Sequence, residues 1–364
     1  MHVTSNRGVP FRSKSVYRSL PPAAAHRRFR SVDWSRMPRP LDFDRDVWPV
    51  IVRDGYDAYY RTLAEVRPEA LPHGLEPITS AIDEWDGAPG ALDAAIAPFV
   101  TATDDRFELA DLIHPAAAAG PFAHPAAFDA WVHDYLERDL DEADAGTRSP
   151  LKAGLWSIGA ARKAVAELIA FDGVLAESFR GGYRDFVSFG GMIGSGPPAF
   201  RTRQLLALAD AGLVHFIGPG ARLRFDESER PFVADSPIVA DSAVAASVLI
   251  DAWMHLPDLG RAADEVVVGL REQGRMRPHV RHASDGTPHP TAAIDVDPET
   301  SRLIAADGSI DPAVIVIGIP LDESRGDTII SPMPGANSTM LRETDRAVAA
   351  AYETLTEARR RAAA

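Results

Sequence analysis

Apolar residues recur at helical spacing along much of the chain. Between residues 44 and 66, large apolar side chains recur at roughly helical spacing, at Val47, Ile51, Tyr56, Tyr59, Tyr60 and Leu63. Residues 125–143 place a comparable set on one helical face, at Phe128, Trp131, Val132, Tyr135, Leu136 and Leu140. Shorter helical patterns occupy 90–99 and 149–170. A period of about 3.6 is typical of amphipathic helices, so we predict a mostly helical region over 44–212.

After Gly212 the pattern becomes strand-like. Short β-prone segments occur, several of them bounded by glycine or proline, at 213–217, 222–225, 231–234, 292–296, 303–305 and 314–317. The last one reads Val-Ile-Val-Ile, an unbroken β-branched run that is typical of a strand buried on both faces. Residues 258–273 favour a helix, and 244–253 fit a strand or a helix equally well. The sequence therefore predicts an α/β chain with a mixed sheet and a large, mostly helical region.

Residues 10–42 interrupt regular structure with five prolines and read as an extended linker. We accordingly divide the chain into 1–43, which includes this linker, the helical region 44–212, and the α/β region 213–364.

Composition excludes several kinds of protein. With 364 residues, 46% hydrophobic and 25% charged, the chain is an ordinary globular one. It has no cysteine, which rules out disulfides, thiolate zinc sites and cysteine nucleophiles. No apolar run approaches the roughly 18 residues of a membrane span, and the first residues lack a secretory signal. We expect a cytoplasmic protein that does not contact membranes.

Charge is distributed unevenly. Residues 1–40 carry nine basic residues and one acid, a balance of +8 within a total of −14, so the other 324 residues carry −22. Such an acidic body argues against nucleic-acid binding. The basic N-terminal segment fits either a docking arm for an acidic surface or phosphate-bearing ligand, or a solvated extended segment.

The most informative stretch is 311–350. A strand ends at Gly318-Ile319-Pro320, and some 17 residues later a helix begins after Gly335-Ala336-Asn337. Asn337 or Ser338 can cap this helix, with help from Thr339. Unpaired N–H groups at a helix start suit a phosphate or the electron-rich edge of a flavin, and glycines allow a ligand close to the backbone. A capped terminal helix lying on an α/β sheet explains the same residues without a ligand.

This stretch resembles the closing motif of FAD- and NAD(P)-binding oxidoreductases that are distantly related to the flavin-containing and ornithine-type N-monooxygenases. Further segments share the likeness: GVPFRSKSVYR (8–18), SFGGMIGSGPPAFRTRQLLALADAGLV (188–214), PFVADSPIV…LIDAWMH (231–255) and GDTIISPMPGANSTMLRETD (326–345). The resemblance implies that an FAD site is lined by Gly318, Ile319, Pro320, Gly335, Ala336, Asn337, Ser338 and Thr339. It implies a small-molecule substrate.

The resemblance also assigns the N-terminal residues to a part of the fold. Residues 2–8 look like the second strand of the NAD(P)-binding half and the turn that follows it. Arg7 in that turn would pair with a 2′-phosphate and favour NADP. Arg7 reads equally as one more exposed arginine of a basic segment.

One departure from the family pattern dominates the interpretation. No G-x-G-x-x-G fingerprint follows a strand, although both cofactor-binding halves should carry one. The glycine-rich residues 190–196 have no strand before them, and Pro197 and Pro198 follow, so we expect a sharp loop there. The sequence thus predicts the C-terminal part or a subunit of the oxidoreductase, with an incomplete FAD/NAD(P)-binding fold. The partner would be an upstream-encoded chain that carries the fingerprints, and this chain alone would be inactive. The alternative is a non-catalytic scaffold subunit that docks on another chain.

No other constellation supports a specific chemistry. His114, His124 and His133 lack metal-ligand spacing, so we expect no metal site. Asp295, Asp297 and Glu299 lack the spacing of a calcium loop. The sequence identifies no general acid or base.

Overall fold

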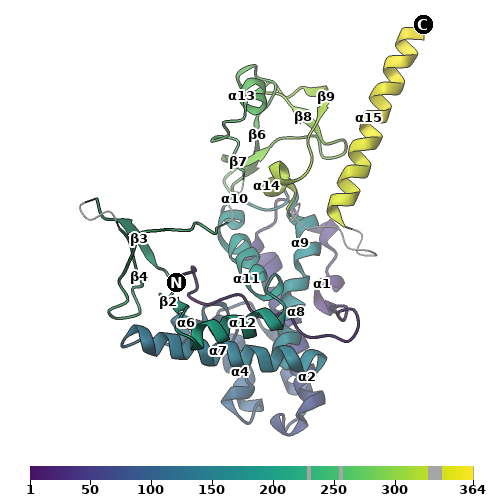
Figure 1. Cartoon of the computed structure of the whole chain (residues 1–364). Helices are drawn as coiled ribbons and strands as arrows, with labels where there is room; N and C mark the ends of the chain where they lie inside the picture. Colours follow the sequence, from purple (N-terminus) through teal and green to yellow (C-terminus); the bar gives the residue numbers. More distant parts are fainter. Residues whose placement is uncertain (228–230, 254–256, 327–337, 364) are drawn as a thin grey trace. The chain divides into compact units, whose positions relative to one another are not determined.

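A computed structural model of the chain describes residues 1–227, 231–253, 257–326 and 338–363 (Figure 1). These residues form two compact units, each built from several stretches of the chain. Unit 1 comprises Met1–Val32, Trp48–Ala161 and Asp185–Ala252, and unit 2 comprises Asp33–Val47, Arg162–Arg184 and Trp253–Ala364. The division into domains at 1–43, 44–212 and 213–364 stays a prediction.

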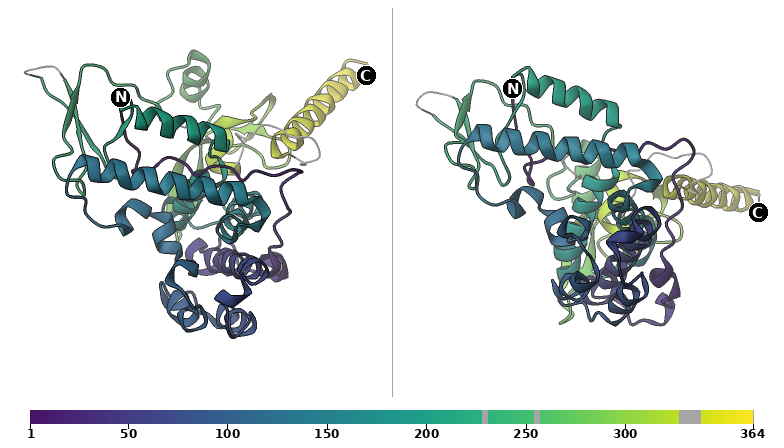
Figure 2. Two further views of the ribbon diagram at one scale, coloured as in Figure 1. Left: turned by 60° about the horizontal axis from the view of Figure 1, so that its bottom comes forward. Right: turned by 90° about the horizontal axis from the view of Figure 1, so that it is seen from below.

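Unit 1 is mainly helical. Its helices are α1 (Arg27–Ser31), α2 (Trp48–Val66), α3 (Glu76–Glu84), α4 (Ala91–Ile96), α5 (Leu109–Ile113), α6 (Pro115–Ala118), α7 (Pro125–Ala145), α8 (Pro150–Ala160), α11 (Arg184–Gly194) and α12 (Ala199–Asp210). Short 3₁₀ turns connect several of them: η3 (Pro68–Ala70), η4 (Ala97–Phe99), η5 (Thr103–Asp105) and η6 (Gly146–Arg148). Figure 2 shows α12 running alongside α7, with which it is in contact.

Helices α2 and α8 pack against each other along unit 1. Two glycines allow this approach: a Cβ on Gly55 would lie 2.7 Å from Ile158, and one on Gly154 would lie 3.0 Å from Phe107. Phe107 in turn packs edge-on against Tyr56, with ring centroids 5.0 Å apart. The predicted apolar face of α2 is buried in this core, so the helical pattern is confirmed here.

The pattern over 125–143 is also confirmed. Pro125 is the first residue of α7, and the Nδ1 atom of His124 accepts a hydrogen bond from the Ala127 N–H at 3.1 Å. This cap and the fixed φ of proline define the helix start. Phe128, Val132 and Leu136 are fully buried, as their spacing predicts.

The predicted loop at 190–196 is wrong for most of its length. Gly190, Gly191 and Gly194 belong to α11, and the helix ends only at Gly194. Apolar residues in the same segment, including Phe189 and Met192, are buried at helical spacing. Their burial outweighs the roughly 0.5–1 kcal/mol that each glycine costs inside a helix.

Unit 1 also holds five short strands in two small sheets. β1 (His2–Val3) pairs in parallel with β2 (His215–Phe216). β3 (Arg222–Phe225), β4 (Phe232–Asp235) and β5 (Val244–Ala246) form an antiparallel sheet in that order. The ambiguous segment 244–253 therefore begins as a strand.

Unit 2 combines two antiparallel hairpins with helices. β6 (Pro278–His282) pairs with β7 (Pro288–Ile294), and β8 (Arg302–Ile304) pairs with β9 (Ile310–Ile315). The helical elements are η1 (Trp34–Arg36), η2 (Phe43–Val47), α9 (Arg162–Ile169), α10 (Ala176–Ser178), η7 (Phe179–Tyr183), α13 (Glu265–Glu272), η8 (Ile319–Leu321), α14 (Asp322–Arg325) and α15 (Thr339–Ala363). Their core contains Leu259, Met276, Ile294, Val296, Leu303 and Leu321.

The prediction that 314–317 is buried on both faces is wrong. The strand β9 ends at Ile315, residues 314–316 are half-buried, and Ile317 is exposed. Within the described residues β9 has one ladder partner, β8. A two-stranded hairpin offers too few neighbours to cover both faces of a strand, whatever its sequence.

The predicted fold class is confirmed: the chain is mixed α/β, with a large helical region over 44–212 and strands after Gly212. Within the part of the chain that the structure describes, the strands are spread over four small sheets. Among the described residues, no helix is long and apolar enough to span a bilayer.

Candidate functional site

The turn after β9 lies at the centre of the predicted cofactor residues. Gly318 has a φ of 81°, which suits glycine, and apart from its chain neighbours no atom of the described residues lies within 4 Å of the position that a Cβ would occupy. Ile319 and Pro320 continue this turn as the 3₁₀ helix η8. The Gly318 backbone therefore has open space on one side, as a close-approaching ligand would require.

The second half of the predicted site is the start of α15. Ser338 and Thr339 stand at this helix start, and the Ser338 carbonyl accepts the N–H of Arg342 at 3.2 Å. The first N–H groups of any helix have no partner within the helix. Gly335, Ala336 and Asn337 lie outside the described residues.

A buried carboxylate connects these two halves within unit 2. Glu343, in the second turn of α15, is 1% exposed, and the Gly318 backbone N–H favours the ionised form of its carboxyl. The structure thus brings the Gly318 turn and the first turns of α15 together. Burial raises the pKa of the Glu343 carboxyl, and the nearby cations Arg325 and Arg346 oppose this rise.

Arg325 is the buried cation beside Glu343, with its Nε 3.6 Å from a carboxylate oxygen. Its Nη2 donates to the Ser301 hydroxyl at 2.8 Å, and its guanidinium lies over the Phe171 ring. Burial lowers the pKa of Arg325. The sequence pattern had not indicated either member of this pair.

These residues fit one edge of a flavin only. Open space at Gly318 and the helix start of α15 suit the electron-rich rim of such a ring. The Gly318 N–H interacts with the Glu343 carboxyl, whose ionised form it favours. The described residues contain no glycine-rich turn between a strand and a helix that would cradle a pyrophosphate.

Arg7 belongs to unit 1, apart from the residues above. It stands in a turn after β1 that the Gly8 N–H closes on the Ser5 carbonyl at 3.0 Å. Its Nε donates to the Ile113 carbonyl at 2.8 Å, and its Nη1 donates to the Ser188 hydroxyl at 2.8 Å. Burial lowers the pKa of Arg7. This half-buried arginine ties the turn to two helical segments, which an exposed linker arginine would not do.

A fully buried charge cluster lies elsewhere in unit 1. Asp139 on α7 accepts hydrogen bonds from Arg12 at 3.1 Å, from Lys152 at 2.7 Å and from the Ser13 N–H at 2.6 Å. The Arg12 guanidinium also lies over the Tyr135 ring, 4.9 Å from its centroid. Burial lowers the pKa of Lys152. Two cations thus share one carboxylate, and the cluster fastens residues 12–13 to α7 and α8.

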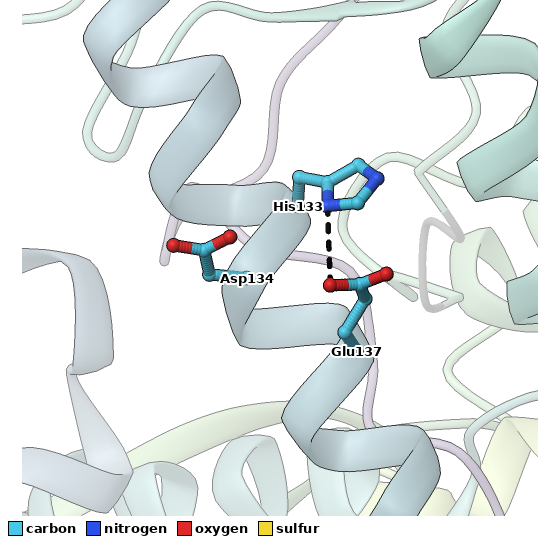
Figure 3. Close-up of side chains that lie close together, drawn as sticks. All are labelled: His133, Asp134 and Glu137. Atoms are coloured by element: carbon cyan, nitrogen blue, oxygen red, sulfur yellow. Dashed lines mark ion pairs between the residues drawn. The ribbon is translucent and has the colours of Figure 1, made fainter.

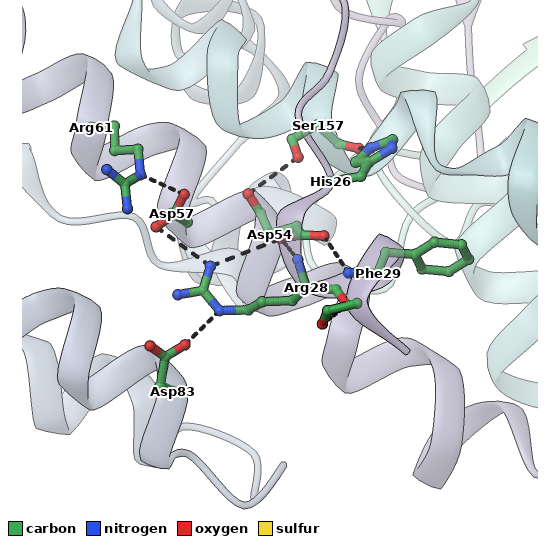
Figure 4. A network of polar contacts seen from close by, with 9 residues as sticks. His26, Arg28, Phe29, Asp54, Asp57, Arg61, Asp83 and Ser157 are labelled. Atoms are coloured by element: carbon green, nitrogen blue, oxygen red, sulfur yellow. Dashed lines mark hydrogen bonds and ion pairs between the residues drawn. The ribbon is translucent and has the colours of Figure 1, made fainter. Parts of the chain in front are cut away.

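A second polar network fastens α1 to α2 (Figure 4). The Asp54 carboxylate accepts the N–H groups of Arg28 and Phe29, each at 3.0 Å, and so caps α1 from another helix. Arg28 also lies 3.4 Å from Asp57, which pairs with Arg61 at 2.6 Å. The role of these acids in holding the N-terminal segment could not be read from sequence spacing.

This network borders a pocket of about 260 Å³ in unit 1. Its walls include Ala58, Ala153 and Trp156, and its polar rim includes His26 and Arg61. The Nε2 atom of His26 lies 2.7 Å from the Ser157 carbonyl, so this nitrogen carries a proton. The pocket can hold a small molecule, but the acids beside it already have partners.

One exposed cluster has the residue types of a metal site (Figure 3). His133, Asp134 and Glu137 lie together on α7. The two ring nitrogens of His133 face carboxylates, with Nδ1 3.6 Å from Glu137 and Nε2 3.0 Å from Asp210. An imidazole held between two carboxylates is an ordinary surface ion-pair arrangement, so the cluster needs no metal to explain it.

Unit 2 contains a buried histidine that sequence patterns also missed. The Nδ1 of His279 lies 3.2 Å from Asp295, whose other oxygen accepts Nε of Arg277 at 2.7 Å. Within the described residues, Nε2 of His279 has no hydrogen-bond partner. The pair bridges β6 and the end of β7, which fixes the orientation of the ring.

No protein-family model matches the chain. It is 30% identical over 371 residues to an L-aspartate N-monooxygenase (nitrosuccinate-forming) of Streptomyces davaonensis. This alignment covers 99% of this chain and 56% of the relative. A Streptomyces cremeus protein of the same name is 29% identical over 98% of this chain and 54% of its own length. A nitrosuccinic acid synthase of Aspergillus oryzae is 26% identical over 96% of this chain and 54% of its own length.

The chain is therefore similar to proteins named as N-monooxygenases or as a nitrosuccinic acid synthase along nearly its whole length. It spans about half the length of the curated relatives it matches. The scaffold alternative gains no support from these relatives.

Proposed function

We propose that this chain is the C-terminal part or a subunit of a flavin-dependent N-monooxygenase that oxidises the amino group of L-aspartate or a similar acidic amino acid. The observation that carries the proposal is the 30% identity to the Streptomyces davaonensis enzyme over 99% of the chain. A match of this extent includes both units, so it does not depend on one shared motif.

The cofactors of the proposal are FAD and NADPH. When bound, FAD would supply the redox chemistry, with NADPH as the hydride donor. Gly318 would give the flavin rim access to the backbone, and the start of α15 would direct N–H groups and a partial positive charge toward it. Glu343 and Arg325 would hold the turn against the helix, so that both elements keep one position relative to the ligand.

The remaining parts of the cofactor sites would come from a polypeptide with the two glycine fingerprints, which we propose to be encoded upstream. Arg7 would contribute to NADPH preference, since a guanidinium pairs with a 2′-phosphate. Its contacts with Ile113 and Ser188 would hold it in place for that role.

A chimera tests the proposed activity. This chain would replace the segment of the Streptomyces davaonensis enzyme that it matches, which is 56% of that enzyme. We expect the purified chimera to retain FAD and to oxidise NADPH faster when L-aspartate is added, with L-ornithine as the comparison substrate. A chimera that retains FAD but responds to no acidic amino acid would refute the proposed substrate class.

The same chimera tests Arg7. Arg7→Ala should weaken NADPH binding by about 1–3 kcal/mol, as for a charge-assisted hydrogen bond, and leave NADH binding nearly unchanged. Ser188→Ala is the control, because it removes one contact of Arg7 and keeps the charge. An equal loss for both nucleotides would argue against a 2′-phosphate role.

A further inference from the structure

One face of α15 carries an apolar stripe that unit 2 does not cover. Leu341, Val348, Tyr352 and Leu355 are 49%, 68%, 71% and 63% exposed. Their spacing of three, four and seven residues places them along a single side of the helix. Single exposed apolar residues are common on protein surfaces, but four large ones on one side of a helix, three of them within the eight residues Val348–Leu355, typically mark an interaction site.

The opposite face of α15 is the one that packs within unit 2. Ala350 and Glu343 are buried there, and the Arg302 side chain donates to the Ala350 carbonyl and to the Thr354 hydroxyl, each at 2.9 Å. Residues two apart on a helix point about 200° away from each other. Val348 therefore faces away from the side on which Ala350 is buried, so the packing within unit 2 leaves the stripe open.

The connection from β9 to α15 indicates what kind of surface the stripe fits. A helix that follows a strand in an α/β layer normally packs on the sheet that contains the strand. Here that sheet has two described strands, β8 and β9. The stripe extends over 14 residues, about 21 Å at 1.5 Å per residue, on the side of α15 that faces away from this hairpin. The hairpin therefore cannot cover the stripe, and a second layer is needed on the outer side of the helix.

The strand β9 also fits a β-sheet as the partner of this surface. The β-branched run 314–317 includes the end of β9 and has the composition of a strand inside a sheet, yet Ile310 at the start of β9 is 50% exposed, and Ile317, just after its end, is 41% exposed. A strand of this composition with one partner among the described residues is suited to further sheet neighbours.

We propose that the α15 stripe, with the exposed side of β9, is the docking surface for a β-sheet domain that corresponds to the part of the relatives not matched by this chain. Those relatives have 44–46% of their length outside the match, enough for a domain of that kind. The choice of partner rests on the proposed function, whereas the docking surface is defined by this chain alone.

A binding experiment tests the surface without any catalytic readout. The probe is the recombinant unmatched part of the Streptomyces davaonensis enzyme, mixed with the wild-type chain or with the double variant Val348→Lys/Leu355→Lys. We expect a 1:1 complex with the wild type by light scattering after size exclusion, and at least tenfold weaker binding of the double variant. Circular dichroism should show that both chains keep the same helix content, since the altered side chains are exposed.

Glu353→Lys is the matched control. Glu353 is exposed on the same helix outside the stripe, and the substitution adds as much positive charge as the double variant. It should bind the probe within twofold of the wild type. The proposal is overturned if the probe does not bind the wild type, or if the double variant binds equally well. It is also overturned if the wild-type chain forms a stripe-dependent dimer that the probe does not dissociate, because a second copy then covers α15. The chimera activity is measured separately, so a failure there leaves this result intact.

Discussion

Asp139 is the carboxylate that two buried cations share in unit 1. Arg12, Lys152 and Asp139 are 5%, 6% and 1% exposed, so water contributes little to their solvation. A buried ion group is tolerated when its charges and hydrogen bonds are matched, and its loss is costly when one partner is removed. The same reasoning gives Asp139 a large expected effect on stability.

Asp139→Asn should lower the free energy of unfolding by about 3–5 kcal/mol, because two buried cations lose their counter-charge. Urea denaturation followed by circular dichroism measures this directly. Asp141→Asn is the control on the same helix: this exposed residue should change stability by less than about 0.5 kcal/mol. If both substitutions lowered the free energy of unfolding equally, the burial of the Asp139 cluster would not explain the effect.

Glu343 gives a prediction with a defined pH dependence. Burial raises its pKa above the ordinary 4.5, so between the two values the folded state binds more protons than the unfolded state. The free energy of unfolding should therefore fall as pH rises from about 4.5 through the raised pKa, and the contribution should be constant above it.

Glu343→Gln removes this titration. We expect the stability of the variant relative to the wild type to increase with pH across that window, in urea denaturation at a series of pH values. Glu353→Gln, at an exposed position, should follow the wild-type curve. Parallel curves for Glu343→Gln and the wild type would contradict the raised pKa.

At the scale of elements, periodicity predicts helices well and glycine predicts loops poorly. The faces of α2 and α7 follow from their apolar spacing, because burial of such a face provides most of the stability of a helix. Gly190 and Gly191 suggested a loop, but the buried neighbours Phe189 and Met192 keep the segment helical. Local propensity is a weak term, and tertiary packing outweighs it in α11.

The α2–α8 contact depends on the absence of a side chain at Gly55. In Gly55→Ala the new methyl would lie 2.7 Å from Ile158, and overpacking of this kind costs about 1–3 kcal/mol. That exceeds the gain of about 0.5–1 kcal/mol from replacing glycine in a helix. We expect a lower midpoint in thermal denaturation.

Gly159→Ala, on α8, is the matched control. Its nearest neighbour would be Ile193 at 3.5 Å, an ordinary contact, so the propensity gain should leave the protein equally or more stable. If Gly55→Ala is as stable as Gly159→Ala, the helices are free to separate, and the close approach is not a constraint.

At the scale of the whole molecule, we expect the isolated chain to bind FAD substoichiometrically. The described residues would line one edge of an FAD site, around Gly318 and the start of α15. They contain no glycine-rich turn that would bind the pyrophosphate, and such a turn provides much of the affinity in a doubly wound fold. The visible absorption of the desalted chain, after incubation with excess FAD, measures retention. The chimera should retain FAD under the same conditions. A folded monomer of this chain with one bound FAD would contradict the prediction.

The sequence by itself determined the buried faces of α2 and α7, the change from helices to short strands after Gly212 and the absence of cysteine chemistry, because these depend on local spacing and composition. Only the tertiary structure decided which distant charges meet. Asp139 and Arg12 are 127 positions apart, and Glu343 reaches the backbone of Gly318 from another element. It also decided that 314–317 is half-exposed, since burial of a strand depends on how many neighbours the fold provides and not on its own β-branched residues.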